Sequence, residues 1–302
     1  MLNRISAFAL LLFLVLLSVA PAHAKVVHQE RSLYRNILVE DNGDLRCLKF
    51  NVKSSKTQQS CYLKSNPDRL VFNYTKLLMS SLLLNAEPKR ILIVGLGGGT
   101  MSNTLMQLYP DSKIDNIEID PAVIKVAREY FGFVENNNVK TYTQDGRIFI
   151  KRALLKKHSY DWIILDAFNG DYIPEHLLTQ EFLQEAKALL SDNGILSANT
   201  FSLSELYAHE SATYKAVFGD FYQVSNLENS NRIILVRKQG LLNQAINVDN
   251  IALLDKKLSA YGVDIKLLYR SMSNTRDKQT WPENTRVLTD QFSPANLLNT
   301  NK

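Results

Sequence analysis

The chain has 302 residues, of which 45% are hydrophobic, and a formal net charge of +5 at pH 7. This is enough apolar material for a substantial buried core, and one large domain with a smaller one is the expected organisation. The positive excess is mild and scattered along the chain, which argues against a nucleic-acid partner.

The first 24 residues have the pattern of a secretory signal peptide. Arg4 precedes an apolar run over residues 7–19, and Ala22-His-Ala24 is a small-x-small cleavage site. The run is too short for a comfortable membrane span, and no other segment has the apolar length to cross a bilayer. We therefore expect a secreted or periplasmic protein without a membrane span once the signal is removed. An uncleaved membrane anchor is the alternative.

Residues 25–66 are expected to form a small N-terminal β domain. Residues 25–34 are polar and are predicted to be loosely held, and Asp41-Asn-Gly-Asp44 is a predicted turn. The predicted antiparallel strands are 36–40, 45–50 and about 58–64.

Both cysteines of the chain, Cys47 and Cys61, lie in this small domain. In an exported protein, a disulfide between them is a reasonable hypothesis. The alternative is two free, partly buried thiols. The sequence contains no Cys/His pattern that resembles a metal site, so we expect none.

Residues 67–240 alternate between predicted helices and strands, after a leading amphipathic helix over residues 70–84. The expected strands are 91–94, 114–119, 139–143, 161–165 and 194–199, and the expected helices are 101–109, 121–131, 146–157 and 179–190. This alternation predicts an α/β fold, a Rossmann-like doubly wound sheet. A helix over 204–218 and late strands near 222–227 and 232–237 favour the methyltransferase-like variant. Residues 241–302 are expected to be a C-terminal helical extension, with one helix over 249–261.

The segment Arg90-Ile-Leu-Ile-Val-Gly-Leu-Gly-Gly-Gly-Thr100 is typical of a buried strand that enters a glycine turn and then a helix. The turn has no Cβ atoms at four positions, so the backbone can bend sharply and a ligand can lie against it. These positions are Gly95, Gly97, Gly98 and Gly99. Glu118, 23 positions after Gly95, ends the next strand, where such sites hold ribose hydroxyls. We predict a nucleotide or nucleoside site.

Acidic residues follow successive predicted strands at the edge where open α/β sheets bind ligands. Glu118 and Asp120 end one strand, Asp145 precedes Gly146 after the next, and Asp166 follows the fourth. In an adenosine site, Glu118 would hold the ribose and Asp145 the exocyclic amine. Asp166 would then face the reacting end, where a carboxylate could accept the proton of an amine nucleophile beside a sulfonium. Asp145 could instead be only a helix N-cap.

These motifs resemble the spermidine synthase family of polyamine aminopropyltransferases, over about residues 34–237. The family passes an aminopropyl group from decarboxylated S-adenosylmethionine to putrescine or a similar amine. The resemblance therefore implies a small-molecule amine substrate, a nucleoside cosubstrate in place of a bound cofactor, and the common homodimer or tetramer. Tyr74 looks like the tyrosine near the attacking amine, and Asp166 looks like the general base. Tyr74 also has the spacing of a core-facing residue, and packing alone is the alternative.

The amine side of the site departs from the family pattern. Gly98 stands where the family has an aspartate that holds the aminopropyl nitrogen, and Asn169 replaces the second aspartate of the gate loop. Thr75-Lys76 replaces a His/Gln-Glu pair, and residues 225–231 lack a Tyr-Pro-Ser-Gly segment. Each lost carboxylate contact could remove on the order of 1.5–3 kcal/mol. The segment from residue 166 to 177 looks most like a divergent spermidine synthase-like branch.

The leading hypothesis is aminopropyl transfer with Asp166 as the base. One alternative is a methyltransferase that uses ordinary S-adenosylmethionine, because the missing acid at Gly98 relaxes discrimination between the two nucleosides. Another is a non-catalytic polyamine- or nucleoside-binding protein, because the nucleosides are made in the cytosol. A nicotinamide dehydrogenase is less favoured, since Thr100 replaces the third glycine of Gly-x-Gly-x-x-Gly. His176 and His209 show no evident partner and are expected at the surface, and Trp162 is expected in the core.

Overall fold

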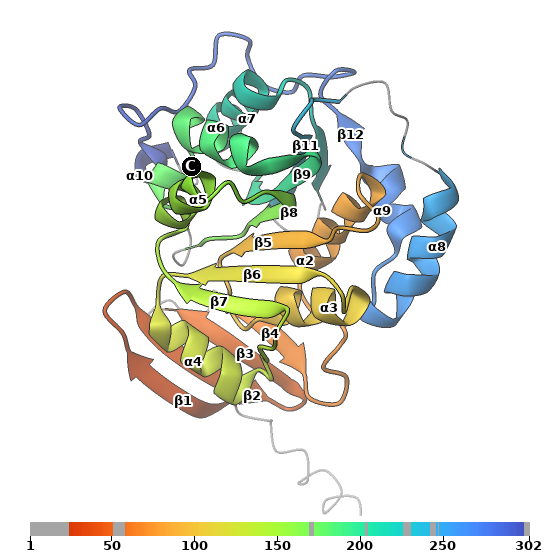
Figure 1. The fold of residues 1–302 in the computed structure, drawn as a ribbon. Helices are drawn as coiled ribbons and strands as arrows, with labels where there is room; N and C mark the ends of the chain where they lie inside the picture. The colour runs from red at the N-terminus through yellow and green to blue at the C-terminus, as the bar shows by residue number, and fades with distance from the viewer. Residues whose placement is uncertain are drawn as a thin grey trace, which may run out of the picture.

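In the computed structural model, a large sheet carries helices on both faces and a smaller sheet packs below it (Figure 1). The described residues are 24–50, 58–168, 172–202, 205–225, 231–241, 246 and 248–298. Except for Ala24, the predicted signal lies outside these ranges, as do Asn169, Asp171 and residues 226–230. Within these ranges, no helix is both long and apolar enough to pass through a bilayer.

The small sheet has four antiparallel strands in chain order. They are β1 Lys25–Arg31, β2 Asn36–Asn42, β3 Leu45–Phe50 and β4 Gln58–Leu63. β1 shows that the prediction of a loosely held segment over residues 25–34 was wrong. β1 pairs with β2 from Lys25, opposite Asp41, to Arg31, opposite Asn36. Backbone hydrogen bonds to β2 therefore make this polar segment a strand. Its sequence lacks the alternation of apolar and polar residues that would predict one.

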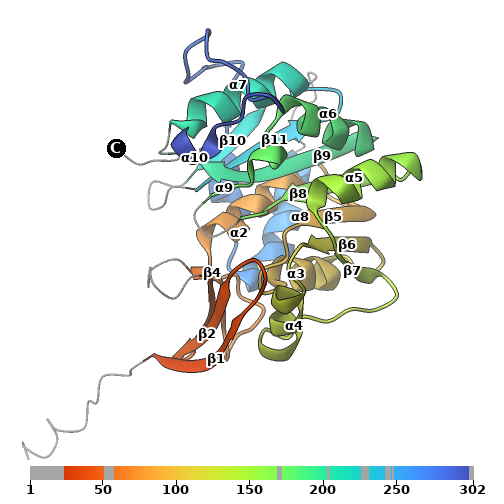
Figure 2. The same cartoon turned by 90° about the vertical axis from the view of Figure 1, so that its left-hand side faces the viewer.

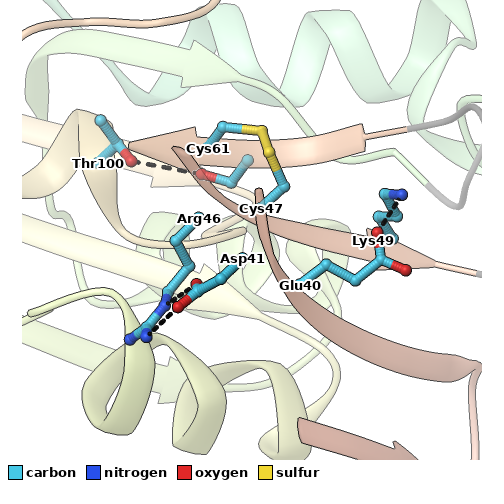
Figure 3. Close-up of a disulfide and its surroundings, with 8 residues drawn as sticks. Glu40, Asp41, Arg46, Cys47, Lys49, Cys61 and Thr100 are labelled. Carbon is cyan, nitrogen blue, oxygen red and sulfur yellow. Dashed lines mark hydrogen bonds and ion pairs between the residues drawn. A yellow bond between two sulfur atoms is a disulfide. The ribbon is translucent and has the colours of Figure 1, made fainter. Parts of the chain in front are cut away.

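Cys47 and Cys61 face each other across β3 and β4 and form a disulfide, which confirms the hypothesis from the sequence (Figure 3). Both side chains are buried. The hydroxyl of Ser60, the residue before Cys61, lies 3.3 Å from the hydroxyl of Thr100 in the large domain. The disulfide therefore cross-links β3 to β4, the strand that contacts Thr100 just after the glycine turn.

Removal of this disulfide is expected to lower the free energy of unfolding by about 2–4 kcal/mol, because the bond closes a loop in the unfolded chain. The two cysteines are separated by 14 residues. Urea unfolding of the Cys47→Ala/Cys61→Ala double variant and of reduced wild type should give the same loss relative to oxidised protein. Equal stability of all three forms would contradict the expectation.

The large sheet has eight strands in the order β12-β10-β11-β9-β8-β5-β6-β7. Its parallel part consists of β5 Arg90–Val94, β6 Lys113–Glu118, β7 Val139–Thr143, β8 Tyr160–Leu165 and β9 Leu190–Phe201. The late strands are β10 Tyr222–Ser225, β11 Asn231–Arg237 and β12 Ser273–Asn274. β11 runs antiparallel to both β9 and β10, so the whole sheet is mixed. The predicted methyltransferase-like fold is confirmed.

Helices cover both faces of this sheet (Figures 1 and 2). On one face lie α2 Asn73–Leu78, its 3-10 continuation η1 Met79–Leu83, and α3 Thr100–Leu108. On the other lie α5 Gly146–Leu155, α6 Gln180–Leu189 and α7 Leu206–Phe218. α4 Pro121–Tyr130 packs between the large sheet and the small one. Trp162 is fully buried in β8, as predicted.

The C-terminal extension contributes to the cores on both faces of the large sheet. α8 Val248–Leu258, η3 Ser259–Tyr261 and α9 Ile265–Ser271 pack beside η1. The chain then crosses to the opposite face and ends in α10 Ala295–Leu298. The sequence predicted one helix in this region, and α9 and α10 were not expected. The prediction that His209 has no partner was wrong. Its Nδ1 lies 2.6 Å from the backbone carbonyl oxygen of Arg286 in this extension.

Candidate active site

The carboxyl ends of β8, β5, β6 and β7 are neighbours in the sheet, which brings the predicted site residues to one edge. Asp166 follows β8, the glycine turn follows β5, Glu118 ends β6, and Asp145 follows β7. The strand pairing links them further, since the backbone N–H of Gly95 donates to the carbonyl of Ile117 at 2.8 Å.

Close approach of neighbouring backbone or side-chain atoms explains two glycines of the turn. Gly95 has φ of +101°, and a Cβ there would lie 2.2 Å from the backbone oxygen of Asp166. A Cβ at Gly98 would lie 2.7 Å from Ser60 Oγ and 3.0 Å from the ring of Phe131. The small sheet and α4 therefore fill the space where the family pattern has an aspartate. A side chain at residue 98 would require the Ser60 hydroxyl and the Phe131 ring to shift.

Glu118 is 7% exposed and its carboxylate is oriented by two backbone donors. Leu96 N–H donates to Oε2 at 3.2 Å, and Asp120 N–H donates to Oε1 at 3.1 Å. Burial raises the pKa of Glu118, and these two donors and the nearby Arg35 oppose the rise. Each carboxylate oxygen has a second lone pair, so the group can still accept hydrogen bonds from ligand hydroxyls.

Asp120, a predicted ligand residue, makes contacts within the protein that stabilise the fold. Its buried carboxylate caps α4 by accepting from Ala122 N–H at 3.0 Å, and it also accepts from the hydroxyl of Ser32. The guanidinium of Arg35 lies 3.7 Å away. These contacts fasten the β1–β2 turn to α4 and leave the carboxylate committed to the protein.

Gly146 is also explained by packing. A Cβ at this position would lie 2.5 Å from Val94 Cγ1, so the glycine lets α5 begin directly against β5.

Asp145 combines the N-cap role with a second contact. One oxygen accepts from Ile148 N–H at 3.0 Å, and the other lies 2.7 Å from Nε2 of His176. The pKa of Asp145 is lowered, first by the hydrogen bond to His176. The prediction that His176 has no partner was therefore wrong. His176 comes from η2 Glu175–Leu177, in the loop after β8, so this pair ties that loop to the start of α5.

Asp166 has a carboxylate whose pKa is strongly shifted. Asn199 Nδ2 donates to its Oδ1 at 2.9 Å, and the nearby Tyr74 hydroxyl, like Asn199, lowers the pKa of this carboxyl. Burial nevertheless raises the pKa of Asp166 to about 7, against the effect of both donors. A carboxylate with a pKa close to the working pH is suited to general base catalysis. Tyr74 packs on the core and also lies near Asp166, so the packing role and the position near the reacting amine are compatible.

Asn199 was not predicted from the sequence. Its Oδ1 accepts from Asn231 Nδ2 at 2.9 Å, so it bridges β11 to Asp166. The available signal was a polar side chain at the carboxyl end of the otherwise buried strand β9, beside β8.

A small, largely apolar pocket with a cavity volume of about 20 Å³ lies beneath the loop after β8. Its lining includes Asn199, and also Val94 and Leu177, whose side chains lie near Gly146. None of the described residues that line this pocket is charged.

Comparisons with known proteins show the family of the chain and a likeness to a methyltransferase. Residues 71–224 match the model of the spermine/spermidine synthase domain. The polyamine aminopropyltransferase of Vibrio vulnificus is 46% identical over 275 residues, which cover 90% of this chain and 91% of the relative. A crystal structure described as a probable spermidine synthase from Corynebacterium glutamicum has a TM-score of 0.68 at 20% identity and covers 88% and 97% of the two chains. Human methyltransferase-like protein 13 in complex with SAH has a TM-score of 0.50 at 26% identity and covers 70% and 92%.

Proposed function

The chain belongs to the spermine/spermidine synthase family, and on this basis we propose that it is a polyamine aminopropyltransferase. It transfers the aminopropyl group of decarboxylated S-adenosylmethionine to a small-molecule amine. The observation that carries the proposal is the carboxylate of Asp166 at the ligand-binding edge of the sheet, which accepts a hydrogen bond from Asn199 and whose pKa burial raises to about 7. No permanently bound cofactor is needed for this reaction.

The proposed chemistry is a single displacement. The amine nitrogen attacks the methylene carbon next to the sulfonium, the new C–N bond forms, and the C–S bond breaks. The electron pair of that bond neutralises the sulfur, and methylthioadenosine leaves. The nitrogen then loses a proton to Asp166, whose negative charge also favours the sulfonium before the reaction.

The nucleoside would lie over the glycine turn with its ribose hydroxyls on Glu118. Its adenine amine would reach Asp145, where it would share or replace the contact that His176 makes. Glu118 and Asp145 belong to neighbouring strand ends, β6 and β7, which supports this placement. Asp120 is left out of the ligand set because its carboxylate caps α4.

Glu118→Gln tests the nucleoside half of the proposal. The variant should bind decarboxylated S-adenosylmethionine roughly 10- to 100-fold more weakly than wild type in calorimetry, because a charged acceptor for the ribose hydroxyls becomes neutral. Glu135→Gln is the matched control, since Glu135 pairs with Arg128 at the surface. Unchanged affinity of the Glu118 variant would place the ribose elsewhere.

Incubation of each nucleoside with a panel of amines, followed by identification of the products, separates the alternatives. An aminopropyltransferase releases methylthioadenosine and forms an elongated amine. A methyltransferase, favoured by the glycine at residue 98 and by the likeness to methyltransferase-like protein 13, releases S-adenosylhomocysteine from ordinary S-adenosylmethionine. A non-catalytic binder shows affinity without either product.

We further propose that the protein is secreted or periplasmic. The signal-like N-terminus supports export, and so does the Cys47–Cys61 disulfide, because such bonds persist in oxidising compartments. Cell fractionation with mass measurement of the mature chain tests export and distinguishes a cleaved signal from an uncleaved anchor. The homodimer that the family resemblance suggests is tested by analytical ultracentrifugation.

A further inference from the structure

We propose that the C-terminal segment, residues 286–295, positions the purine end of the active site through Asp290 and Arg147. The inference rests on the proposed nucleoside site and adds positioning residues to it. It concerns a part of the chain that lies beyond residues 71–224, which match the family domain.

The C-terminal segment is anchored on the face of the sheet that carries α5, α6 and α7. Leu288 and Ala295 are fully buried there. Leu288 N–H donates to the Thr213 hydroxyl of α7 at 2.9 Å, and Gln180 N–H of α6 donates to the Leu288 carbonyl at 2.8 Å. Figure 1 shows this part of the chain in dark blue, at the left of the large domain, where it enters α10. The segment is thus an integral part of the folded domain.

Arg147 connects this segment to the start of α5. Its guanidinium donates to both oxygens of Asp290, at 2.7 and 2.8 Å, and to both oxygens of Glu185 in α6, at 3.0 and 2.9 Å. Arg147 lies two residues after Asp145, the predicted adenine ligand. Such two-pronged, charge-assisted bonds fix orientation as well as distance, so Arg147 sets where the first turn of α5 sits.

The same segment also holds the loop that carries His176. The Thr179 hydroxyl donates to Asp290 at 2.7 Å, and the Ser293 hydroxyl donates to the backbone carbonyl of Glu175, the residue before His176, at 3.0 Å. Both partners of the Asp145–His176 contact are therefore held by residues 290–293. Asp290 is the shared point, because it contacts the start of α5 and the start of α6.

The Arg147–Asp290 contact stays ionised across the working pH range. The guanidinium of Arg147 lowers the pKa of Asp290 to about 2, and Asp290 and Glu185 raise the pKa of Arg147. Asp290 does not reach the reacting atoms, so its effect on catalysis passes through the placement of Asp145 and His176. Small displacements of binding groups have large kinetic consequences.

Asp290→Asn is the test, with steady-state kinetics on the full chain. The KM for decarboxylated S-adenosylmethionine should rise roughly tenfold, while kcat and the KM for the amine stay within about twofold. Arg147→Lys should produce the same pattern, because lysine keeps the charge and loses the fork. Asp255→Asn is the matched control, since Asp255 pairs with Lys266 in the α8–α9 region across the molecule. Ser293→Ala should give a smaller shift in the same direction.

Calorimetry with decarboxylated S-adenosylmethionine separates the possible failures. If wild type does not bind it, the proposed nucleoside site fails and the inference falls with it. If wild type binds and Asp290→Asn binds equally well, the nucleoside site stands and the positioning role is overturned. A fall in kcat and a rise in both KM values, accompanied by a lower unfolding midpoint, would show a general structural role and would also overturn it.

Discussion

Asp166→Asn is expected to lower kcat for methylthioadenosine release by about 10²- to 10⁴-fold, the usual contribution of a general base. Asparagine keeps the shape of the side chain and can still bond Tyr74 and Asn199, but it cannot take the proton of the attacking amine. Initial rates at saturating nucleoside and amine give the comparison. Asp192→Asn is the control, because Asp192 lies exposed beside Lys238.

The pH profile gives the same prediction a second readout. In wild type, kcat/KM should rise with pH and show a step near 7, because Asp166 must lose its proton before it can accept one and its pKa is about 7. The residual activity of Asp166→Asn should lack this step. Full activity of the variant, or an unchanged step, would assign the base to another group.

The periodic part of the fold could be predicted from the sequence because its signals are local. Buried parallel strands such as β5 and β8 are continuous apolar runs, and the carboxyl ends of such strands meet at one edge. The glycine turn, Glu118, Asp145 and Asp166 are therefore predicted at one edge from the sequence alone. Their roles toward a ligand remain predictions.

The features that were missed depend on contacts between distant parts of the chain. The polar strand β1 exists because β2 offers it backbone partners. Asp120 has the position of a ligand in the sequence, but the long-range partners Ser32 and Arg35 take its carboxylate. His176 contacts Asp145, and Asn199 contacts Asp166, only once the loop after β8 and strand β9 have folded beside these acids. No local pattern encodes such pairings.

Asp166→Asn is also expected to stabilise the protein at pH 8, by on the order of 2 to 4 kcal/mol. The folded state raises the pKa of Asp166 from 3.8 to about 7, so folding favours the protonated form. Below pH 4 the group is protonated in both states and costs nothing. Stability is then lost progressively as pH rises from about 4 to 7, because the folded protein must bury a charge. Urea unfolding of variant and wild type at pH 4, 6 and 8 measures the difference.

Asp145→Asn provides a control of opposite sign at the same edge. The folded state lowers the pKa of Asp145 through His176, so this carboxylate stabilises the fold at neutral pH and loses that contribution as pH falls through its lowered pKa. Its asparagine variant should therefore be less stable than wild type at pH 8. A stabilisation by Asp166→Asn that is equal at pH 4 and pH 8 would mean that side-chain shape, and not buried charge, is responsible. Changes of opposite sign in the free energy of unfolding of the two variants would show that the charge of Asp166, the carboxylate that must accept a proton, destabilises the fold.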